Sequence, residues 1–479
     1  MKQTLLFSFL FFTGSFLWAQ NNEFELKITF KPFKNQFIYL GYYMGKQRPI
    51  IDSVMLDNNS SAVFKKNKKI EKGIYLIGYP GKSGYFEILI DKEQKFSVFT
   101  DTLNVMKTLT FEGSLDNTLF LQYQNFTADK AREIEDAKAM LPLAKTKVDS
   151  TNLQAIIKKG ESDIQQNRNS IITNNPDATI TALLKAMRDP VIPSAENHPG
   201  GKYDSTFAYR YFKDHFWDDA YFYDERLVRT TFFEDKLDRY FEQLVPLNPD
   251  SVIKELDWML AYASINDEMQ RFLLVKFVNR YLNLKYLWED KVYIHLFEKY
   301  FSQKNYSWLS EAGKKTIFDR AYSLMANLMG NPSAEIELPD STGKQKKLFA
   351  ITEPYTLVVF WDPTCGHCKE TLPRIDSIYR AKWKALHVKI YAIAKETDGT
   401  KKDWLNFVNE HDLKGWEHVY NSKTENNARV NNNIPSYYQL YDVQTVPTLY
   451  LLDKDKRILA KKVTFEQIDE VLDYKLQGK

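Results

Sequence analysis

The chain has 479 residues, of which 44% are hydrophobic and 27% are charged, as is ordinary for a soluble globular protein. At roughly 100–200 residues per domain, this length predicts three or four domains, each large enough to bury a core. The formal net charge is only +3, which excludes a strong overall field for nucleic acid, so we expect no nucleic-acid partner.

Residues 1–19 are interpreted as a signal peptide. Lys2 supplies a positive charge, residues 5–12 form an apolar core, and Ala19 offers a small side chain at the cleavage site. Polar residues interrupt the apolar run, which is too short to span a membrane. We therefore expect a chain that is exported to the periplasm or cell envelope and is soluble after cleavage.

Residues 20–113 predict an all-β, sandwich-like module. Residues 24–30 alternate apolar and polar side chains with period two, as a half-buried strand does. Six further β-prone segments follow at a spacing of roughly 8–12 residues, at 37–40, 50–54, 62–64, 74–77, 85–90 and 96–99. We expect a small antiparallel sandwich or barrel that serves packing or partner docking, because it carries no catalytic constellation.

Residues 114–330 predict an all-α module. Aromatic residues recur at helical spacing, for example at Tyr209, Phe212 and Phe216, and core packing between helices is favoured over a ligand box. The Pro- and Gly-rich stretch 185–204 is interpreted as a long loop or lid. The three histidines of this module lie far apart without ligand spacing, so no metal is assigned.

Residues 331–479 alternate between predicted strands and helices, which indicates an α/β domain whose sheet is covered on both faces. The expected strands are 357–361, 388–394, 447–453 and 458–463, the expected helices are 365–385, 404–411 and 465–476, and the Asn-rich stretch 421–438 is expected to be an insertion loop.

The only two cysteines of the chain lie between the first of these strands and the helix that follows it. They form the run Cys365-Gly366-His367-Cys368, and a spacing of three residues at the first turn of a helix allows a disulfide. Cys365 is expected at the helix N-terminus, where unpaired amide groups and the helix dipole favour a thiolate. A strand, a CxxC motif and a helix N-terminus together predict a redox-active dithiol.

This domain resembles the thioredoxin superfamily, and most of all the exported TlpA-like thiol–disulfide oxidoreductases. The resemblance is carried by Phe360-Trp361, the CxxC motif with Lys369, Pro373 and the run 443–448 with Val446-Pro447-Thr448. It covers about 331–479, and the two upstream segments resemble the β module and helical module of similar proteins of Bacteroidetes type. The resemblance implies a thioredoxin fold and no bound cofactor beyond the Cys365–Cys368 couple.

Roles for individual residues follow from the resemblance. Cys365 would be the nucleophile that attacks a substrate disulfide, and Cys368 would resolve the mixed disulfide. Val446 and Pro447 match the cis-proline segment, which would bind the substrate chain together with Trp361. These roles imply, as partners, exported proteins with disulfides or thiols and an unidentified electron donor of the membrane or envelope.

The dipeptide Gly366-His367 would tune the redox couple, since a protonated His367 stabilises the Cys365 thiolate and thereby the reduced form. The same dipeptide pattern occurs in protein disulfide isomerases, and a histidine with little effect is the alternative.

Two departures from the family concern the proton acceptor for Cys368. Val359 stands where thioredoxins carry a buried acidic residue, and Thr371 stands where many TlpA-like proteins carry Glu. Glu370 is one residue away, and a shift of one residue turns a side chain by about 100° on a helix. Glu370 is therefore retained as a candidate acceptor, with solvent exposure as the alternative.

The favoured function is a disulfide reductase of the cell envelope, with an oxidase or isomerase as the alternative. A binding scaffold with an auxiliary thioredoxin domain is less favoured. A structural disulfide would not explain the cis-proline match. A zinc site would need a second pair of ligands, and attachment of a c-type haem would need His in place of Lys369. Among the metal functions, only copper delivery through the dithiol is kept, as a minor alternative.

Overall fold

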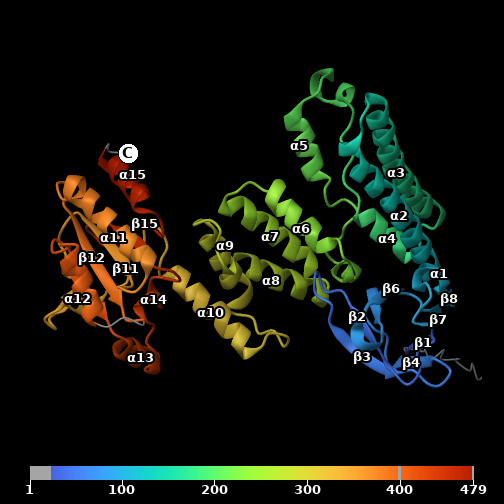
Figure 1. The fold of residues 1–479 in the computed structure, drawn as a ribbon, viewed down its shortest axis with the longest axis horizontal. Helices are drawn as coiled ribbons and strands as arrows, with labels where there is room; N and C mark the ends of the chain where they lie inside the picture. Colours follow the sequence, from blue (N-terminus) through green and yellow to red (C-terminus); the bar gives the residue numbers. More distant parts are fainter. Residues whose placement is uncertain (1–22, 398–400, 477–479) are drawn as a thin grey trace, which may run out of the picture. The chain divides into compact units, whose positions relative to one another are not determined.

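The computed structural model describes residues 23–397 and 401–476, and the signal peptide predicted over 1–19 lies outside them. The chain divides into two compact units. The first comprises the residues up to Leu247 together with Lys254–Lys276, and the second comprises Asn248–Ile253 together with Phe277–Lys479. Along the chain, β sheets are followed by helices and then by an α/β domain, which confirms the predicted fold class (Figure 1). None of the described helices is long and apolar enough to cross a membrane.

The N-terminal module is a sandwich of two four-stranded sheets, with orders β4-β1-β7-β8 and β3-β2-β5-β6. The apolar side chains of both sheets meet in one core. All seven predicted strands are present, but β1 and β7 pair in parallel, so the module is not wholly antiparallel. The strands are β1 (Phe24–Lys31), β2 (Phe37–Tyr42), β3 (Ile50–Met55), β4 (Ser61–Lys66), β5 (Gly73–Gly78), β6 (Tyr85–Ile90), β7 (Lys95–Asp101) and β8 (Thr110–Glu112).

The middle of the chain is helical, as predicted. Its aromatic residues pack against one another, for example Trp217 against Tyr240 with ring centroids 5.3 Å apart, which supports core packing over a ligand box. The stretch 185–204 begins with the last two residues of α4 and is otherwise irregular apart from two short 3₁₀ turns. The helices are α1 (Val105–Thr108), α2 (Leu115–Met140), α3 (Lys147–Asn174), α4 (Thr179–Ala186), α5 (Ser205–Asp214), α6 (Phe233–Gln243), α7 (Pro249–Ala263), α8 (Asp267–Leu282), α9 (Glu289–Leu296) and α10 (Glu311–Met325).

The C-terminal domain is built on a five-stranded sheet of order β13-β12-β11-β14-β15. Strand β12 pairs in parallel with both β11 and β13. Strand β14 pairs antiparallel with both β11 and β15. Its strands are β9 (Glu337–Pro339), β10 (Gln345–Lys347), β11 (Tyr355–Trp361), β12 (Val388–Lys395), β13 (Glu417–Asn421), β14 (Thr448–Leu452) and β15 (Ile458–Lys461). Its helices are α11 (Gly366–Ile378), α12 (Lys401–Glu410), α13 (Lys423–Asn431), α14 (Tyr437–Leu440) and α15 (Phe465–Leu476).

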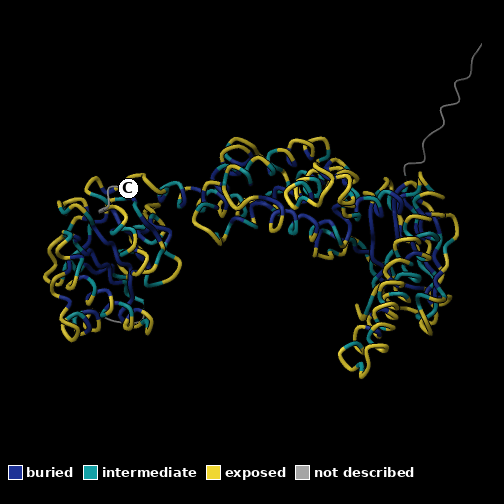
Figure 2. The backbone as a smooth tube through the Cα atoms, turned by 90° about the horizontal axis from the view of Figure 1, so that it is seen from above, coloured by how far each residue is buried: buried dark blue, intermediate teal, exposed yellow. Residues whose placement is uncertain are grey.

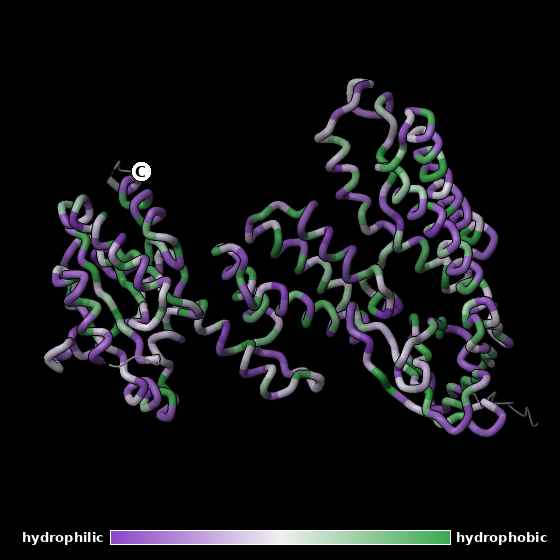
Figure 3. The backbone as a smooth tube through the Cα atoms, viewed as in Figure 1, coloured by the Kyte–Doolittle hydropathy of each residue, from purple (hydrophilic) through white to green (hydrophobic). Residues whose placement is uncertain are grey.

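Strand β11 is buried on both faces, as its continuous apolar sequence predicts. Val359 and Trp361 belong to the core on one side of the sheet, and Val358 and Phe360 belong to the core on the other. The strands of this domain are buried in Figure 2, and Figure 3 shows the same runs as hydrophobic. The carboxyl end of β11, which leads into the CxxC motif, is therefore held in place by packing against the apolar cores on both sides of the sheet.

The stretch 421–438 was predicted to be a loop, and this is wrong. It contains the end of β13 and the helices α13 and α14. The Ser422 hydroxyl accepts a hydrogen bond of 3.1 Å from the Glu425 amide at the start of α13. Such a cap is worth about 1 kcal/mol, which offsets the weak helix propensity of the asparagines in this stretch.

Helices α9 and α10 belong to the same compact unit as the C-terminal domain. Lys461 of β15 donates hydrogen bonds of 2.6 Å both to Asp290 of α9 and to the carbonyl oxygen of Asn327, which follows α10. Arg320 of α10 forms an ion pair with Asp442, which is also buried. Because buried charges are stable only when they are paired, these contacts join the helices firmly to the sheet.

Candidate active site

The CxxC motif lies where the end of β11 turns into α11. Cys365 is the N-cap residue of the helix, with an extended backbone, and α11 begins at Gly366. The Cys365 amide donates to the carbonyl oxygen of Asp362 at 3.2 Å, and the Lys369 amide donates to the Cys365 carbonyl oxygen at 3.1 Å. This confirms the predicted position of Cys365 at the N-terminus of the helix, beside the amide groups of its first turn.

The two thiols differ in accessibility. Both cysteines are free, and Cys365 is partly exposed, whereas Cys368 is fully buried. Burial raises the pKa of Cys368 far above its ordinary value, a hydrogen bond with the Asp362 backbone opposes this rise, and the neighbouring Cys365 thiol and Asp362 carboxylate add to it. Cys365 is therefore the accessible sulfur, and Cys368 remains a protonated thiol behind it at neutral pH.

The proline loop, residues 444–448, lies directly against the accessible sulfur of Cys365. The peptide bond between Val446 and Pro447 is cis, as the resemblance implied. The Cys365 sulfur lies 3.8 Å from the Val446 carbonyl oxygen, and both loop residues are partly exposed. Strand β14 begins at Thr448 and pairs with β11 at Phe360, which brings this loop beside the CxxC motif. The structure thus brings together Cys365, Val446 and Pro447.

The remaining predicted residues lie in different surroundings. Gly366 and His367 are exposed at the first turn of α11. Trp361 has no exposed surface, and its ring packs against Phe407 with centroids 5.2 Å apart. The structure therefore gives the Trp361 side chain a packing role below the site in place of the expected substrate contact.

Glu370 is exposed on α11, whereas the next residue, Thr371, faces the groove described below. The shift of one residue thus turns the carboxylate away from the site, as the alternative interpretation of the sequence held.

Asp362 is the site residue that sequence reasoning missed. Its side chain is only 5% exposed and accepts hydrogen bonds from the amide and the hydroxyl of Thr364, at 2.8 and 2.7 Å. Burial alone would raise its pKa, but hydrogen bonds from Thr397 and Thr364 and the charge of Lys395 outweigh burial and lower it. Asp362 is therefore an ionised carboxylate next to Cys368. Its place at the carboxyl end of a buried strand, three residues before Cys365, is the signal that could have identified it.

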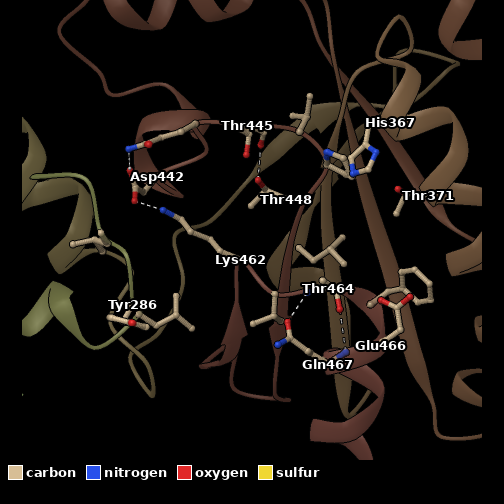
Figure 4. A pocket seen from close by; sticks show the side chains of 18 of the residues that line it. Tyr286, His367, Thr371, Asp442, Thr445, Thr448, Lys462, Thr464, Glu466 and Gln467 are labelled. Atoms are coloured by element: carbon tan, nitrogen blue, oxygen red, sulfur yellow. Dashed lines mark hydrogen bonds and ion pairs between the residues drawn. The ribbon is translucent and has the colours of Figure 1, made fainter. Parts of the chain in front are cut away.

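A groove of about 820 Å³ opens at the site, all of it within the second unit. His367 and Thr371 of α11, the loop 444–448 and the segment 462–467 line it (Figure 4). Residues 284–287, between α8 and α9, also line it, together with Arg320 and Asp442. An extended peptide laid along this groove would meet both the proline loop and the first turn of α11.

Among the described residues, no group of three or more His, Cys, Asp or Glu side chains is arranged to hold a metal ion.

Two family models match the chain. Residues 353–458 match the model described as thioredoxin-like, and residues 160–326 match a domain of unknown function, DUF5106. The first match contains the CxxC motif, the proline loop and the central strands of the sheet. The second covers most of the helical segment.

Curated relatives match the C-terminal part of the chain. Thiol-disulfide oxidoreductase ResA from one strain of Bacillus cereus is 27% identical over 149 residues, which are 31% of this chain and 77% of that protein. ResA from a second strain of this species is 27% identical over 169 residues, which are 34% of this chain and 88% of that protein. Methylamine utilization protein MauD from Paracoccus versutus is 32% identical over 85 residues, which are 18% of this chain and 40% of that protein.

Solved structures also match. A thioredoxin-like protein from Bacteroides caccae is 21% identical, with a TM-score of 0.43, and the match covers 60% of this chain and 98% of that one. The thioredoxin domain of a thiol-disulfide oxidoreductase from Bacteroides vulgatus is 23% identical, with a TM-score of 0.26, and the match covers 30% and 98%.

Proposed function

We propose that this chain, which is a TlpA-like protein of the thioredoxin superfamily through its C-terminal domain, reduces disulfides of proteins in the cell envelope. Its thioredoxin-like domain is that of a protein disulfide oxidoreductase. The observation that carries the proposal is the position of Cys365, partly exposed and 3.8 Å from the Val446 carbonyl oxygen, with the fully buried Cys368 behind it.

The first step is an attack of the Cys365 thiolate on one sulfur of a substrate disulfide. A mixed disulfide between Cys365 and the substrate forms, and the other substrate sulfur leaves as a thiolate that takes up a proton. Cys368 is kept protonated by its burial, so it does not compete with Cys365 for this attack.

The second step releases the product. Cys368 loses its proton and attacks the Cys365 sulfur, and the second substrate sulfur leaves and is protonated. Two electrons pass from the two protein thiols to the substrate, which leaves a Cys365–Cys368 disulfide and two substrate thiols. No bound cofactor is needed, but a dithiol donor of the membrane or envelope has to return two electrons and two protons.

The envelope location belongs to the proposal and is supported by the signal-peptide pattern of residues 1–19. In an oxidising compartment, a single pair of cysteines at a helix N-terminus suits exchange with other proteins.

The reduction potential of the Cys365–Cys368 couple tests the direction of electron flow. The full chain is equilibrated with glutathione buffers and the thiols are counted by alkylation, with Cys365→Ser as the control. A potential near or below about −270 mV supports a reductase, and a potential of about −180 to −120 mV would instead assign an oxidase or isomerase. In parallel, Cys368→Ser should accumulate the mixed disulfide with a substrate protein, because the second step is lost.

A further inference from the structure

The helical segment contributes one wall of the groove at the active site. Residues 284–287 line the same groove as His367 and Pro447. Arg320 joins the end of α8, just before this wall, to Asp442, just before the proline loop, because it donates to the Leu282 carbonyl oxygen at 2.9 Å and forms an ion pair with Asp442. In Figure 4, Tyr286 lies on the side of the groove opposite Thr464 and Gln467. A peptide that reaches Cys365 along the groove therefore passes residues outside the thioredoxin-like match.

This wall is held in one conformation before any ligand arrives. The carboxylate of Glu289, which is itself buried, accepts hydrogen bonds from the amides of Lys285 and Tyr286, at 2.5 and 3.1 Å. The Tyr286 ring stacks on Trp288, with centroids 5.8 Å apart and planes 5° apart. Tyr286 nevertheless remains 49% exposed. A rigid, half-exposed aromatic ring binds apolar side chains well, because little conformational freedom is lost on binding.

The groove carries an excess of positive charge. Lys285, Arg320, Arg374 and Lys462 line it, against the carboxylates of Asp442 and Glu466. Both carboxylates are paired within the groove, Asp442 with Arg320 and Lys462, and Glu466 with Arg374. The Glu289 carboxylate, which accepts from the Lys285 and Tyr286 amides, offsets one of the positive charges, and the charge that remains favours an acidic partner.

We propose that residues 284–287 select the substrate: an extended acidic segment of a disulfide-containing protein, which carries an apolar side chain that packs on Tyr286. This inference rests on the proposed function and adds a specificity element from outside the thioredoxin-like domain. Tyr286 and Lys285 act in binding and do not take part in the exchange of electrons.

The test compares disulfide substrates with the full-length reduced protein. Two peptide disulfides share Leu at the same position of the extended segment that flanks the cysteine and carry either Glu or Lys at the other flanking positions. The small neutral reference is 2-hydroxyethyl disulfide. For Tyr286→Ala, we expect the ratio of kcat/KM for the Glu peptide to that for the small disulfide to fall about tenfold, as the loss of a buried aromatic contact predicts.

A matched control variant is available at Tyr262. This tyrosine is also 49% exposed and also packs against a tryptophan, Trp258, with ring centroids 5.6 Å apart, but it does not line the groove. Tyr262→Ala should leave the ratio unchanged. The thermal unfolding midpoints of the two variants are compared so that a general loss of structure is recognised.

The charge is tested at Lys285. Lys285→Glu should lower the preference for the Glu peptide over the Lys peptide, by about threefold to tenfold, as expected for a charge at the rim of an interface. An unchanged ratio in Tyr286→Ala together with an unchanged peptide preference in Lys285→Glu would overturn the inference while leaving the reductase intact. If the wild-type protein reduces none of the three disulfides, the proposed function itself fails.

Discussion

Lys461 offers a sharp test of how the helices and the C-terminal domain hold together. Its side chain is 3% exposed, and its ammonium group lies 2.6 Å from the Asp290 carboxylate and 2.6 Å from the Asn327 carbonyl oxygen. At that distance and an effective dielectric constant of about 20, Coulomb's law gives roughly 6 kcal/mol of attraction before desolvation is subtracted.

Lys461→Met removes this attraction and leaves the buried Asp290 carboxylate without its partner. Breaking a buried pair from one side costs about 3–5 kcal/mol, and a domain has only about 5–15 kcal/mol of stability in all. We therefore expect a loss of about 3–5 kcal/mol in the free energy of unfolding. The double variant Asp290→Leu/Lys461→Met should lose less than the single one, because no unpaired charge is left buried.

Labelling of Cys368 measures this loss. In a Cys365→Ser background, Cys368 is the only thiol of the chain, and because it is fully buried it reacts only when its domain opens. Its labelling is followed as urea is increased. Lys315→Met is the control, since Lys315 pairs with Asp319 on the surface and is 75% exposed, and it should change stability by less than about 1 kcal/mol. If Lys461→Met unfolds at the same urea concentration as this control, the reasoning is refuted.

Four further predictions concern the site. Asp362→Asn, made in the Cys365→Ser background, should lower the pKa of Cys368, because a neighbouring negative charge is removed. The pH profile of Cys368 alkylation should therefore shift to lower pH, and an unshifted profile would contradict this. Because the pKa of Cys368 is raised in the folded state, its contribution to stability is present below about pH 8.5 and is lost at higher pH. Relative to Cys368→Ala, the reduced protein should therefore lose up to about 1.36 kcal/mol per pH unit in urea unfolding above that pH. Glu370→Gln should leave disulfide reduction unchanged, because the side chain is exposed, and a large loss of rate would return Glu370 to the mechanism. His367→Pro should make the reduction potential more negative, by about 30 mV for each 1.4 kcal/mol of lost thiolate stabilisation, and an equal potential would show that His367 does not tune the couple.

Much of the fold could be predicted because its signals are local. The alternation along 24–30 gives β1, and the continuous apolar run before Cys365 gives the central strand β11. The parallel pairing of β1 with β7 could not be predicted, since these strands are far apart in sequence. Helix α13 was missed because the weak propensity of its asparagines masks the cap at Ser422.

The residues of the site likewise fall into those that a local sequence pattern identifies and those that it does not. Cys365, Cys368 and Pro447 stand in recognisable motifs, and the structure brings them together. Asp362 was overlooked because it stands at neither of the two positions at which related proteins carry the acidic residue. The contribution of residues 284–287 depends on tertiary packing about 80 positions before the CxxC motif, and no local pattern encodes it.

The last border between the two compact units along the chain lies within α8, between Lys276 and Phe277, and the short segment Asn248–Ile253 also belongs to the second unit. The family matches, by contrast, cover 160–326 and 353–458. The segments that are recognised as families are therefore not the segments that pack as units. A thioredoxin-like domain excised after α10, from residue 331 onward, would carry β15 away from the helices that neutralise its buried lysine. A transplanted domain would have to bring α9 and α10 with it, or replace that lysine first.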